Sequence, residues 1–452
     1  MEETLRDLRA RAIQLQQAGK LDEASLCYAR YLARAPRDAG VWSNLGVLHR
    51  VAGRHALSLR AQRRAVALAP EEVGFRNNLA NILSDVGEYD ASISERRWAL
   101  ERDPTNLNHK AMIGRCYRGL GQYKTAIDYL EQAIADHPND VELKMQLAFA
   151  QLGQGDYATA FETYKIRWQA GELKQRSLPF PEWSGEALDG KTVLVLPEQG
   201  FGDAVLFARF IPTLKKLGAT VHCLVERPLA ALFEGLEGAD HVGQGVSADT
   251  KIDCWLNMMD LAALHFKETS AIPSPTVLNV PQDSADRAQR IVDPFPDVLK
   301  VGVIWTGSVT YKGNAFRSFS HTDFLPLTDI AGVQLFSLYK GPMLAPYFED
   351  GSSALIVDTG SDERGFADTA ATMRAMDLVI TSDTATAHIA GSLGIPTWTV
   401  LHWDPFWVWT HQGETTPWYP NMKLFRQKTP LNWTDVMAEI RDALTFYSKD
   451  KK

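Results

Sequence analysis

A 34-residue periodicity dominates the first 170 residues of this 452-residue chain. Prolines and glycines each recur at this spacing, and two further registers hold only small residues. The four registers are Pro36, Pro70, Pro104 and Pro138; Gly19, Gly53, Gly87, Gly121 and Gly155; Ala12, Gly46, Ala80, Gly114 and Ala148; and Ala24, Ser58, Ser92, Ala126 and Ala160. A repeat of this length indicates one small helical unit copied along the chain, which folds as a solenoid.

Each register has a physical role in a helical hairpin. Small residues let two antiparallel helices approach closely, glycine takes the turn at positive φ, and proline ends the second helix. One hairpin leaves an apolar face that only its neighbour covers, so several must stack. The second unit, Trp42-x-x-Leu45-Gly46 with Gly53 and Pro70, resembles the tetratricopeptide repeat. We expect about five such repeats over residues 4–170.

A solenoid of this kind has a concave groove that commonly holds an extended peptide or a helix of another protein. We therefore expect residues 4–170 to bind a protein partner; a purely architectural or dimerising array is the alternative. Side chains on first-helix segments that can face the groove are Arg76, Asn77, Asn78, Lys110 and Arg115.

Composition argues against several classes of protein. A net charge of −8 is unusual for a nucleic-acid binder, which normally carries a basic surplus. No apolar run predicts a transmembrane helix, and the charged N-terminus does not resemble a signal peptide. The four cysteines have neither zinc spacing nor the pattern of a disulfide framework. A cytoplasmic protein with reduced thiols is therefore expected.

After Trp168 the periodicity stops, and residues 171–189 are predicted to be a linker. Short apolar runs then alternate with helical patterns, which predicts parallel sheets covered by helices. The predicted strands are Thr192–Leu196, Thr220–Val225, Lys300–Trp305, Val333–Leu338, Ala354–Asp358, Asp377–Thr381 and Thr397–Leu401. The predicted helices are Ala204–Leu217, Pro228–Leu236, Phe366–Met376, Thr384–Leu393 and Asn432–Tyr447.

The expected fold class is α plus α/β, a solenoid followed by two Rossmann-like lobes. An interruption rich in Pro and Asp around Gln282–Pro296 divides the strand–helix alternation into two series. The lobes are expected at residues 190–295 and 296–430, with a C-terminal helix and tail at 431–452. Ligands of such sheets bind beyond the carboxyl ends of the strands.

The first candidate site is the segment Pro197–Asp203, which follows the strand Thr192–Leu196. Gly200 and Gly202 allow close approach of the backbone to a ligand, and the next helix begins here with free N–H groups. Asp203 can be a helix cap or a general base. The third glycine of a dinucleotide fingerprint is missing, because that position is Val205.

The second candidate site begins the helix after the strand Asp377–Thr381. The first helical turn has unpaired N–H groups and a partial positive charge, and threonine hydroxyls add donors. This pattern favours a site for a diphosphate or an anionic sugar; the alternative is a capped helix with a core histidine. The candidate residues are Asp383, Thr384, Ala385, Thr386 and His388.

The third candidate site is the loop after the strand Lys300–Trp305, which holds Lys312 and Arg317. Two cations near a cleft can neutralise a pyrophosphate leaving group, although an exposed basic loop is the alternative. Lys340, after the strand Val333–Leu338, is a further candidate. The sequence has no Asp-x-Asp triplet and no metal-ligand spacing, so neither a metal nor another cofactor is expected.

These motifs, in this order, resemble glycosyltransferase family 9, the bacterial heptosyltransferase family of the GT-B fold. The resemblance lies in Gly202-Asp203, Val301–Ser320, Asp377–Leu401 and Thr416–Gln427. Bacterial proteins that join tetratricopeptide repeats to such a domain, some of which modify flagellin, are similar in plan. Eukaryotic O-linked N-acetylglucosamine transferase has a similar plan too.

The resemblance implies a metal-independent transferase that uses a nucleotide-sugar. Asp203 would be the base toward the acceptor hydroxyl, and Asp383 to His388 would hold the donor phosphates. Gly200, Gly202, Lys312, Arg317 and Lys340 would complete the phosphate and nucleotide site. Heptosyltransferases usually have glycine where this chain has Ala385, and often proline or valine where it has Thr386. The resemblance therefore does not extend to ADP-heptose as donor.

The resulting expectation is a protein O-glycosyltransferase whose repeats hold the acceptor, flagellin being one candidate. A glycolipid or polysaccharide glycosyltransferase and a non-catalytic scaffold are the alternatives. An aromatic cluster follows the last predicted strand and is expected to pack the C-terminal helix across the lobes, although it could stack on sugars or bases. Its members are Trp403, Phe406, Trp407, Trp409, Trp418 and Tyr419.

Overall fold

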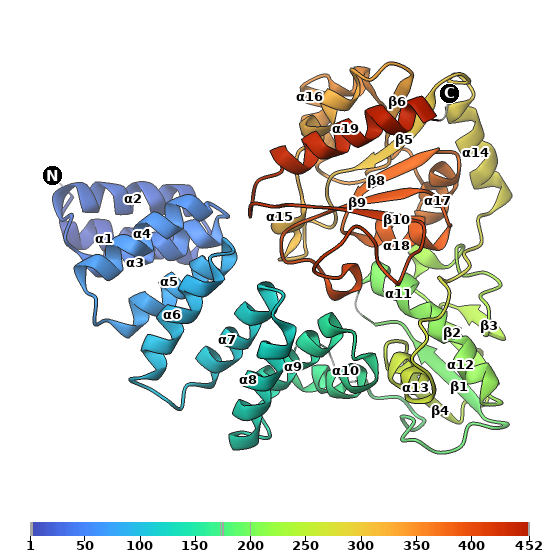
Figure 1. Ribbon diagram of the computed structural model, residues 1–452, viewed down its shortest axis with the longest axis horizontal. Coiled ribbons are helices and arrows are strands. Elements are labelled where there is room, and N and C mark those ends of the chain that lie inside the picture. Colours follow the sequence, from blue (N-terminus) through green and yellow to red (C-terminus); the bar gives the residue numbers. More distant parts are fainter. Residues whose placement is uncertain (1–2, 172, 174–175, 199, 451–452) are drawn as a thin grey trace. The chain divides into compact units, whose positions relative to one another are not determined.

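The computed structural model describes residues 3–171, 173, 176–198 and 200–450. The chain divides into two compact units, Met1–Gln154 and Gly155–Lys452. The first unit is helical, and both β-sheets lie in the second (Figure 1). Part of the predicted linker, Gln199 and the last two residues of the predicted tail lie outside the described residues.

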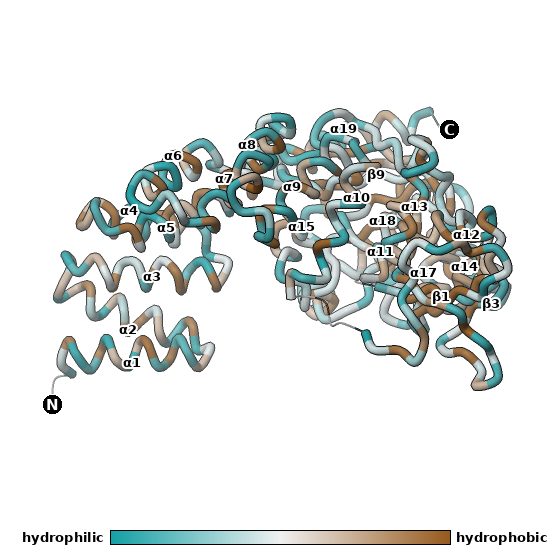
Figure 2. The backbone as a smooth tube through the Cα atoms, turned by 90° about the horizontal axis from the view of Figure 1, so that it is seen from below, coloured by the Kyte–Doolittle hydropathy of each residue, from teal (hydrophilic) through white to brown (hydrophobic). Residues whose placement is uncertain are grey.

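The described part of the first unit consists of helices that pack pairwise and in chain order. These are α1 (Leu5–Gln17), α2 (Leu21–Arg34), α3 (Ala39–Val51), α4 (His55–Leu68), α5 (Val73–Asp85), α6 (Tyr89–Leu100), α7 (Leu107–Gly119), α8 (Tyr123–Asp136) and α9 (Val141–Gln154). In Figure 2, hydrophobic and hydrophilic residues alternate along these helices, as expected when one face of each helix is buried.

The glycine and small-residue registers have the roles that the sequence predicts. All five register glycines adopt positive φ, between 70° and 89°, in turns that follow the first helix of each hairpin. The register from Ala24 to Ala160 is fully buried, with 0% exposure at each position. A methyl group on Gly114 would lie 2.5 Å from Leu130 Cδ2 on the partner helix, so only glycine allows this approach.

The second unit begins with two short helical segments, α10 (Tyr157–Tyr164) and the 3-10 helix η1 (Lys165–Gln169). A four-stranded sheet follows, in the order β3-β2-β1-β4. Its strands are β1 (Thr192–Leu196), β2 (Thr220–Leu224), β3 (His241–Gly243) and β4 (Cys254–Asn257). All of its strand pairs are parallel. The helices of this part are α11 (Phe201–Phe207), η2 (Ala208–Phe210), α12 (Pro212–Lys216), η3 (Arg227–Leu229) and α13 (Asp260–Glu268).

A six-stranded sheet, also parallel throughout, has the order β10-β9-β8-β5-β6-β7. Its strands are β5 (Leu299–Ile304), β6 (Val333–Ser337), β7 (Ile356–Asp358), β8 (Leu378–Ser382), β9 (Thr397–Leu401) and β10 (Met422–Arg426). Its helical segments are α14 (Gln282–Val292), α15 (Asn314–Arg317), η4 (His321–Leu327), α16 (Leu344–Glu349), η5 (Ser352–Ala354), α17 (Phe366–Arg374), α18 (Ala385–Ser392), η6 (Trp407–Trp409) and α19 (Thr434–Asp450). The α plus α/β class is therefore confirmed.

Several predicted elements differ from the structure. The helix predicted at Ala204–Leu217 is divided into α11, η2 and α12, because Pro212 has no N–H and begins a new helix. The segment Pro228–Leu236 forms only the 3-10 turn η3 and irregular turns. Most of the interruption at Gln282–Pro296 is α14, which buries only a narrow stripe of Ser284, Ala288 and Val292. The sequence also did not predict β3, β4 and β10.

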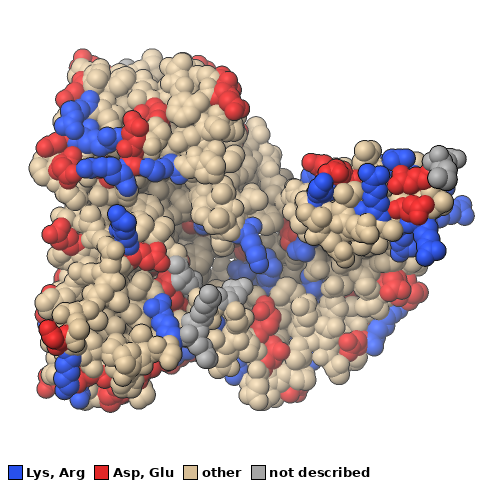
Figure 3. Space-filling view, turned by 180° about the vertical axis from the view of Figure 1, so that it is seen from behind, with Lys and Arg blue, Asp and Glu red and all other residues tan. Residues whose placement is uncertain are grey.

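Strands β8 and β9, which lie inside the six-stranded sheet, are buried along their whole length, as central strands covered by helices are. The edge strand β4 is buried as well, and an isolated bridge joins its Trp255 to Glu182. The C-terminal helix α19 begins two residues after the predicted start and packs on η4 and β10. None of the helices in the described ranges is long and apolar enough to cross a membrane. On the face of the molecule shown in Figure 3, basic and acidic side chains are interspersed.

Candidate active site

All three predicted motifs lie at carboxyl ends of strands. The segment Pro197–Asp203 follows β1, the loop with Lys312 and Arg317 follows β5, and the segment beginning at Asp383 follows β8. Strands β5 and β8 are neighbours in the six-stranded sheet, so the second and third motifs begin side by side. The first motif belongs to the other sheet.

Helix α11 brings the first motif against the second. A methyl group on Gly202 would lie 2.9 Å from His388 Cδ2 and 3.3 Å from Ala385 Cα. Distances this short leave no room for a side chain at position 202, so glycine is required by close packing of two helices. The structure thus brings together two motifs that are far apart in the sequence.

Asp203 lies in the first turn of α11 and is half-buried. Its Oδ2 accepts a hydrogen bond from the Gly200 N–H at 3.2 Å. Burial raises the pKa of Asp203 to about 6, and the charges of Glu198 and Asp383 act in the same direction. The hydrogen bond from Gly200 and the charge of Arg317 act against this rise. Asp203 therefore has both the local contact of a cap and the pKa of an effective base.

Helix α18 begins after Thr384, whose backbone is extended as an N-cap requires. Its side chain makes no capping hydrogen bond to a backbone N–H of the helix. The Thr384 and Thr386 hydroxyls contact each other at 2.6 Å, and Thr386 contacts the Thr381 hydroxyl at 2.9 Å. The Thr381 hydroxyl in turn donates to the Ser382 carbonyl at 3.0 Å. Since these contacts use the hydroxyl protons, the donors left for an anion are the backbone N–H groups of the first turn.

Asp383 is buried and does not face an open site. Its Oδ1 accepts a hydrogen bond from Trp409 Nε1 at 2.7 Å. The carboxylate therefore fixes the loop after β8 against the aromatic residues of η6. A negative charge at this place opposes a bound phosphate, so we assign Asp383 a positioning role rather than a direct contact.

His388 is buried and pairs with Tyr419. Its Nδ1 lies 3.0 Å from the Tyr419 hydroxyl, and its ring stacks on Trp409 at 5.1 Å between centroids. Burial, together with the nearby charges of Arg209 and Arg317, lowers the pKa of His388 to about 3. The imidazole is therefore neutral at physiological pH. It can offer a neutral contact to a ligand but no positive charge.

Of the three predicted basic residues, Arg317 is the one that lies close to the start of α18. A methyl group on Gly307 would lie 2.7 Å from Thr384 Cγ2 and 3.3 Å from Arg317 Nη2, so the guanidinium lies near the start of α18. Its Cζ also lies 4.5 Å from the centre of the Tyr311 ring. Arg317 lowers the pKa of both Asp203 and His388. It is thus placed to neutralise negative charge between the two motifs.

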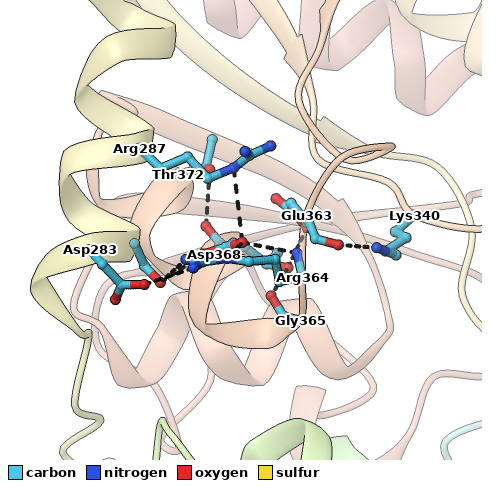
Figure 4. A network of polar contacts seen from close by, with 10 residues as sticks. Asp283, Arg287, Lys340, Glu363, Arg364, Gly365, Asp368 and Thr372 are labelled. Carbon is cyan, nitrogen blue, oxygen red and sulfur yellow. Dashed lines mark hydrogen bonds and ion pairs between the residues drawn. The ribbon is translucent and has the colours of Figure 1, made fainter.

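Lys312 and Lys340 have different settings. Lys312 is exposed in its loop. Lys340, beyond β6, donates to the backbone carbonyl of Glu363, beside a network that joins α14 to α17 (Figure 4). In that network Arg364 bonds to Asp283 and to Asp368. Within the described ranges, no hydrogen bond or ion pair joins either lysine to the start of α18.

A buried cluster of ion pairs includes Glu198 of the first motif. The sequence did not predict this cluster. Arg167 on η1 binds Glu198 through Nε at 2.5 Å and Nη2 at 2.8 Å, and Asp260 at 2.8 Å. Burial alone would lower the pKa of Arg167, but the two carboxylates raise it above its ordinary value. The only available signal was Glu198 itself, an acidic residue next to the apolar strand β1.

Arg209 is another residue that the sequence did not indicate. It is buried, and its Nη1 donates a hydrogen bond to the Trp418 carbonyl at 2.9 Å. Its Cζ lies 4.7 Å from the centre of the Tyr419 ring. Arg209 therefore supplies positive charge close to His388 and Tyr419, which helps to keep the imidazole neutral.

The aromatic cluster packs, as expected, and its ring contacts reach residues of α18 and α10. Trp409 and Tyr419 enclose His388 on α18. Trp407 and Trp418 contact Tyr157 of α10, whose hydroxyl accepts a hydrogen bond from Trp418 Nε1 at 3.0 Å. The C-terminal helix contacts other residues, including Trp398 through Tyr447. The cluster thus anchors α18 and α10.

Among the described residues, no group of three or more His, Cys, Asp or Glu side chains could hold a metal ion. Basic side chains and helix N–H groups are the features of this region that can neutralise a phosphate.

Comparison with known families identifies the N-terminal helices. Models of the tetratricopeptide repeat match residues 9–73 and 117–165. The N-terminal helices are tetratricopeptide repeats. Solved repeat structures are also similar to this chain, among them MamA (41-end) from Desulfovibrio magneticus RS-1, at 15% identity and a TM-score of 0.35 over 38% of this chain and 99% of that one. A tetratricopeptide repeat protein from Parabacteroides merdae matches at 16% identity and a TM-score of 0.34, over 37% and 66%.

A relative with a longer chain is Protein FlbA of Caulobacter vibrioides. It is 28% identical over 318 residues, which cover 63% of this chain and 52% of FlbA. This chain thus spans about half the length of that relative. Because the repeats occupy less than 63% of this chain, the similarity extends into the sheet-containing unit.

Proposed function

We propose that this protein is a metal-independent glycosyltransferase of the GT-B type. The four-stranded and six-stranded sheets would be its two lobes, with the nucleotide-sugar held by the second. The sugar passes to a Ser or Thr hydroxyl of a protein that the tetratricopeptide repeats hold in the cytoplasm. The observation that carries this proposal is the packing of Gly202 on Ala385 and His388, which sets Asp203 beside the start of α18.

The residues divide the reaction between them. Asp203 takes the proton from the acceptor hydroxyl, and its raised pKa makes it a stronger base than an ordinary carboxylate. The hydroxyl oxygen attacks the anomeric carbon as the bond to the nucleoside diphosphate breaks. Backbone N–H groups at the start of α18 and the Arg317 guanidinium stabilise the departing diphosphate. Thr384 and Thr386 hold the helix start in shape, and neutral His388 packs beneath it.

Repeats bind protein partners, and this property fits a protein acceptor. Binding energy from a remote segment of the acceptor would position one hydroxyl against Asp203 and raise its effective concentration. The family resemblance suggests flagellin as one candidate acceptor. Two alternatives stay open: transfer to a glycolipid or polysaccharide, and a scaffold that binds partners without catalysis.

The proposal is tested by incubating the full-length protein with flagellin and with proteins that co-purify with it. A panel of UDP-, ADP-, GDP- and CMP-sugars serves as donors, and intact-mass spectrometry follows each acceptor. An increase by the mass of a sugar residue on a protein supports the proposal. Transfer only to lipid or polysaccharide extracts would favour the first alternative. No transfer with any donor, together with retained protein binding, would favour the scaffold.

A further inference from the structure

Arg96 is a buried arginine without a carboxylate partner. It lies on α6 and is 1% exposed. Its Nη2 donates to Asn81 Oδ1 at 2.8 Å and its Nε to Ser92 Oγ at 3.3 Å. Its Nη1 is buried and has no hydrogen-bond partner within the described chain. A guanidinium stays charged, and a buried charge is costly unless an opposite charge lies near.

The repeat register shows that packing does not require this arginine. The equivalent residues in the neighbouring repeats, 34 positions away on either side, are Gln62 and Leu130. Both are uncharged and buried, at 1% and 0% exposure. Arg96 thus places a charge where the adjacent hairpins have uncharged core side chains. A role other than filling the hairpin is expected, because a neutral side chain fills the same place in its neighbours.

The charges around Arg96 are mostly positive. Burial lowers the pKa of Arg96, the charges of Arg115 and Arg50 act in the same direction, and the Cys116 thiol acts against them. Arg50 is already paired with Asp85, through Nη2 at 3.1 Å. Arg115 is half-buried on α7, and its side chain has no hydrogen bond or ion pair to another described residue. Among the described residues, neither Arg96 nor Arg115 therefore has a carboxylate as counter-charge.

Asn81 and Arg115 are partly exposed residues near Arg96 that occupy the same position in successive repeats. They stand one repeat apart, in register with Val47 and Phe149 on the neighbouring first helices, and all four are half-buried. Because Arg96 donates to Asn81 Oδ1, the amide oxygen points inward. The Asn81 amide N–H groups are then left to face away from Arg96.

We propose that Asn81 and Arg115 bind a carboxylate of an acidic, extended protein segment, with Arg96 orienting Asn81 and supplying charge from beneath. The partner carboxylate provides the counter-charge that the cluster lacks, and a guanidinium binds a carboxylate through two charge-assisted hydrogen bonds. The inference rests on the proposed function only in taking this segment to belong to the acceptor.

The test uses the full-length protein and fluorescence anisotropy. The probes are a labelled peptide of alternating Glu and Ser and a matched peptide of alternating Gln and Ser. The wild type is expected to bind the Glu peptide, and Arg115→Ala and Arg96→Met to weaken this binding by about tenfold each. Arg64→Ala, at an exposed arginine on α4, is the matched control and is expected to bind like the wild type.

The melting temperature of Arg96→Met distinguishes the proposal from a purely structural role of Arg96. Replacing a buried unpaired charge by Met is expected to leave the melting temperature unchanged or higher, while binding weakens. A lower melting temperature of Arg96→Met, with Glu-peptide binding intact in both variants, would overturn the proposal. Equal affinity for the Glu and Gln peptides would do so too.

Two other ligands of this surface, a nucleic acid and a second copy of the chain, would give different binding results. Stronger binding of a DNA or RNA oligonucleotide than of the Glu peptide, dependent on Arg115, would replace the proposal by nucleic-acid binding. Self-association that Arg115→Ala abolishes would replace it by a second copy of the chain. Asp203→Asn is expected to bind the Glu peptide normally. If the wild type transfers no sugar from any donor but keeps Arg115-dependent binding, only the proposed function is disproved. If the wild type transfers sugar but shows no preference for the Glu peptide, only this inference is disproved.

Discussion

Gly202 on α11 and Ala385 on α18 lie so close that a methyl group on Gly202 would stand 3.3 Å from Ala385 Cα. The two residues belong to motifs that follow strands of different sheets. Their contact places Asp203, the next residue after Gly202, where the charges of Asp383 and Arg317 act on its pKa.

Substitution of Gly202 is expected to separate the two helices. In Gly202→Val the side chain would overlap His388 and Ala385, so we expect at least about a tenfold loss of transfer and a lower melting temperature. The measurements are transfer rate and thermal unfolding. Gly245→Ala is the control, because a methyl group there meets nothing within 4 Å. Full activity of Gly202→Val would show that the contact does not matter.

The activity is expected to depend on the protonation of Asp203. Its pKa of about 6 means that the carboxyl is largely protonated below that pH and ionised above it. The rate of transfer should therefore rise with pH through about 6 and then level off. Affinity for nucleoside diphosphate, measured over the same range, separates catalysis from binding. A flat rate profile between about pH 5 and 7 would argue against Asp203 as the base.

The buried pair between Arg167 and Glu198 is expected to be important for stability. Arg167→Ala leaves the Glu198 and Asp260 carboxylates without their counter-ion, which should cost about 3–5 kcal/mol in the free energy of unfolding. Urea denaturation measures this cost. The exposed pair of Lys165 with Glu162 is the matched comparison, and Lys165→Ala should change stability by less than about 1 kcal/mol. Equal effects of both substitutions would contradict the assignment.

Glu363 is expected to make the folded state less stable as the pH rises. Burial raises the pKa of Glu363 to about 8 from an ordinary value of 4.5, so the folded protein keeps a proton that the unfolded chain has lost. The stability linked to this group is present below about pH 4.5 and is lost as the pH rises to 8.

The neutral substitution Glu363→Gln removes this dependence. We expect the variant to match the wild type near pH 4.5 and to be more stable above pH 8, by roughly a few kcal/mol. Urea denaturation at both pH values measures the difference, with Glu349→Gln as an exposed control. A constant difference between Glu363→Gln and the wild type at all pH values would show that Glu363 does not titrate in this way.

The sequence predicts the repeats well because every structural position recurs. Turn glycines such as Gly53 and buried small residues such as Ala80 each repeat along the chain, so one pattern reports the same environment many times. The sheets are predicted only in part: apolar strands such as Thr192–Leu196 and Thr397–Leu401 stand out from their neighbours, whereas β4 and β10 were missed. The short strand β3 has no such run and was not predicted.

The chemistry of the site depends on contacts that no local pattern contains. The sequence places Asp383 and His388 at a helix start, but Trp409 and Tyr419, which bind them, come from a distant loop. Burial keeps His388 neutral, and the hydrogen bond from Trp409 engages the Asp383 carboxylate. The contact of Gly202 with Ala385 likewise joins two sheets, and the strand–helix alternation says nothing of which helices meet.

The central claim is that Asp203 removes the proton from a protein hydroxyl. The most direct measurement is intact-mass spectrometry of an acceptor captured on the full-length Asp203→Asn protein. The complex is then given nucleotide-sugar alone or with added wild-type protein. We predict that the acceptor stays unmodified with Asp203→Asn and gains the mass of a sugar residue only when the wild type is present. Equal modification by Asp203→Asn and the wild type would contradict this assignment.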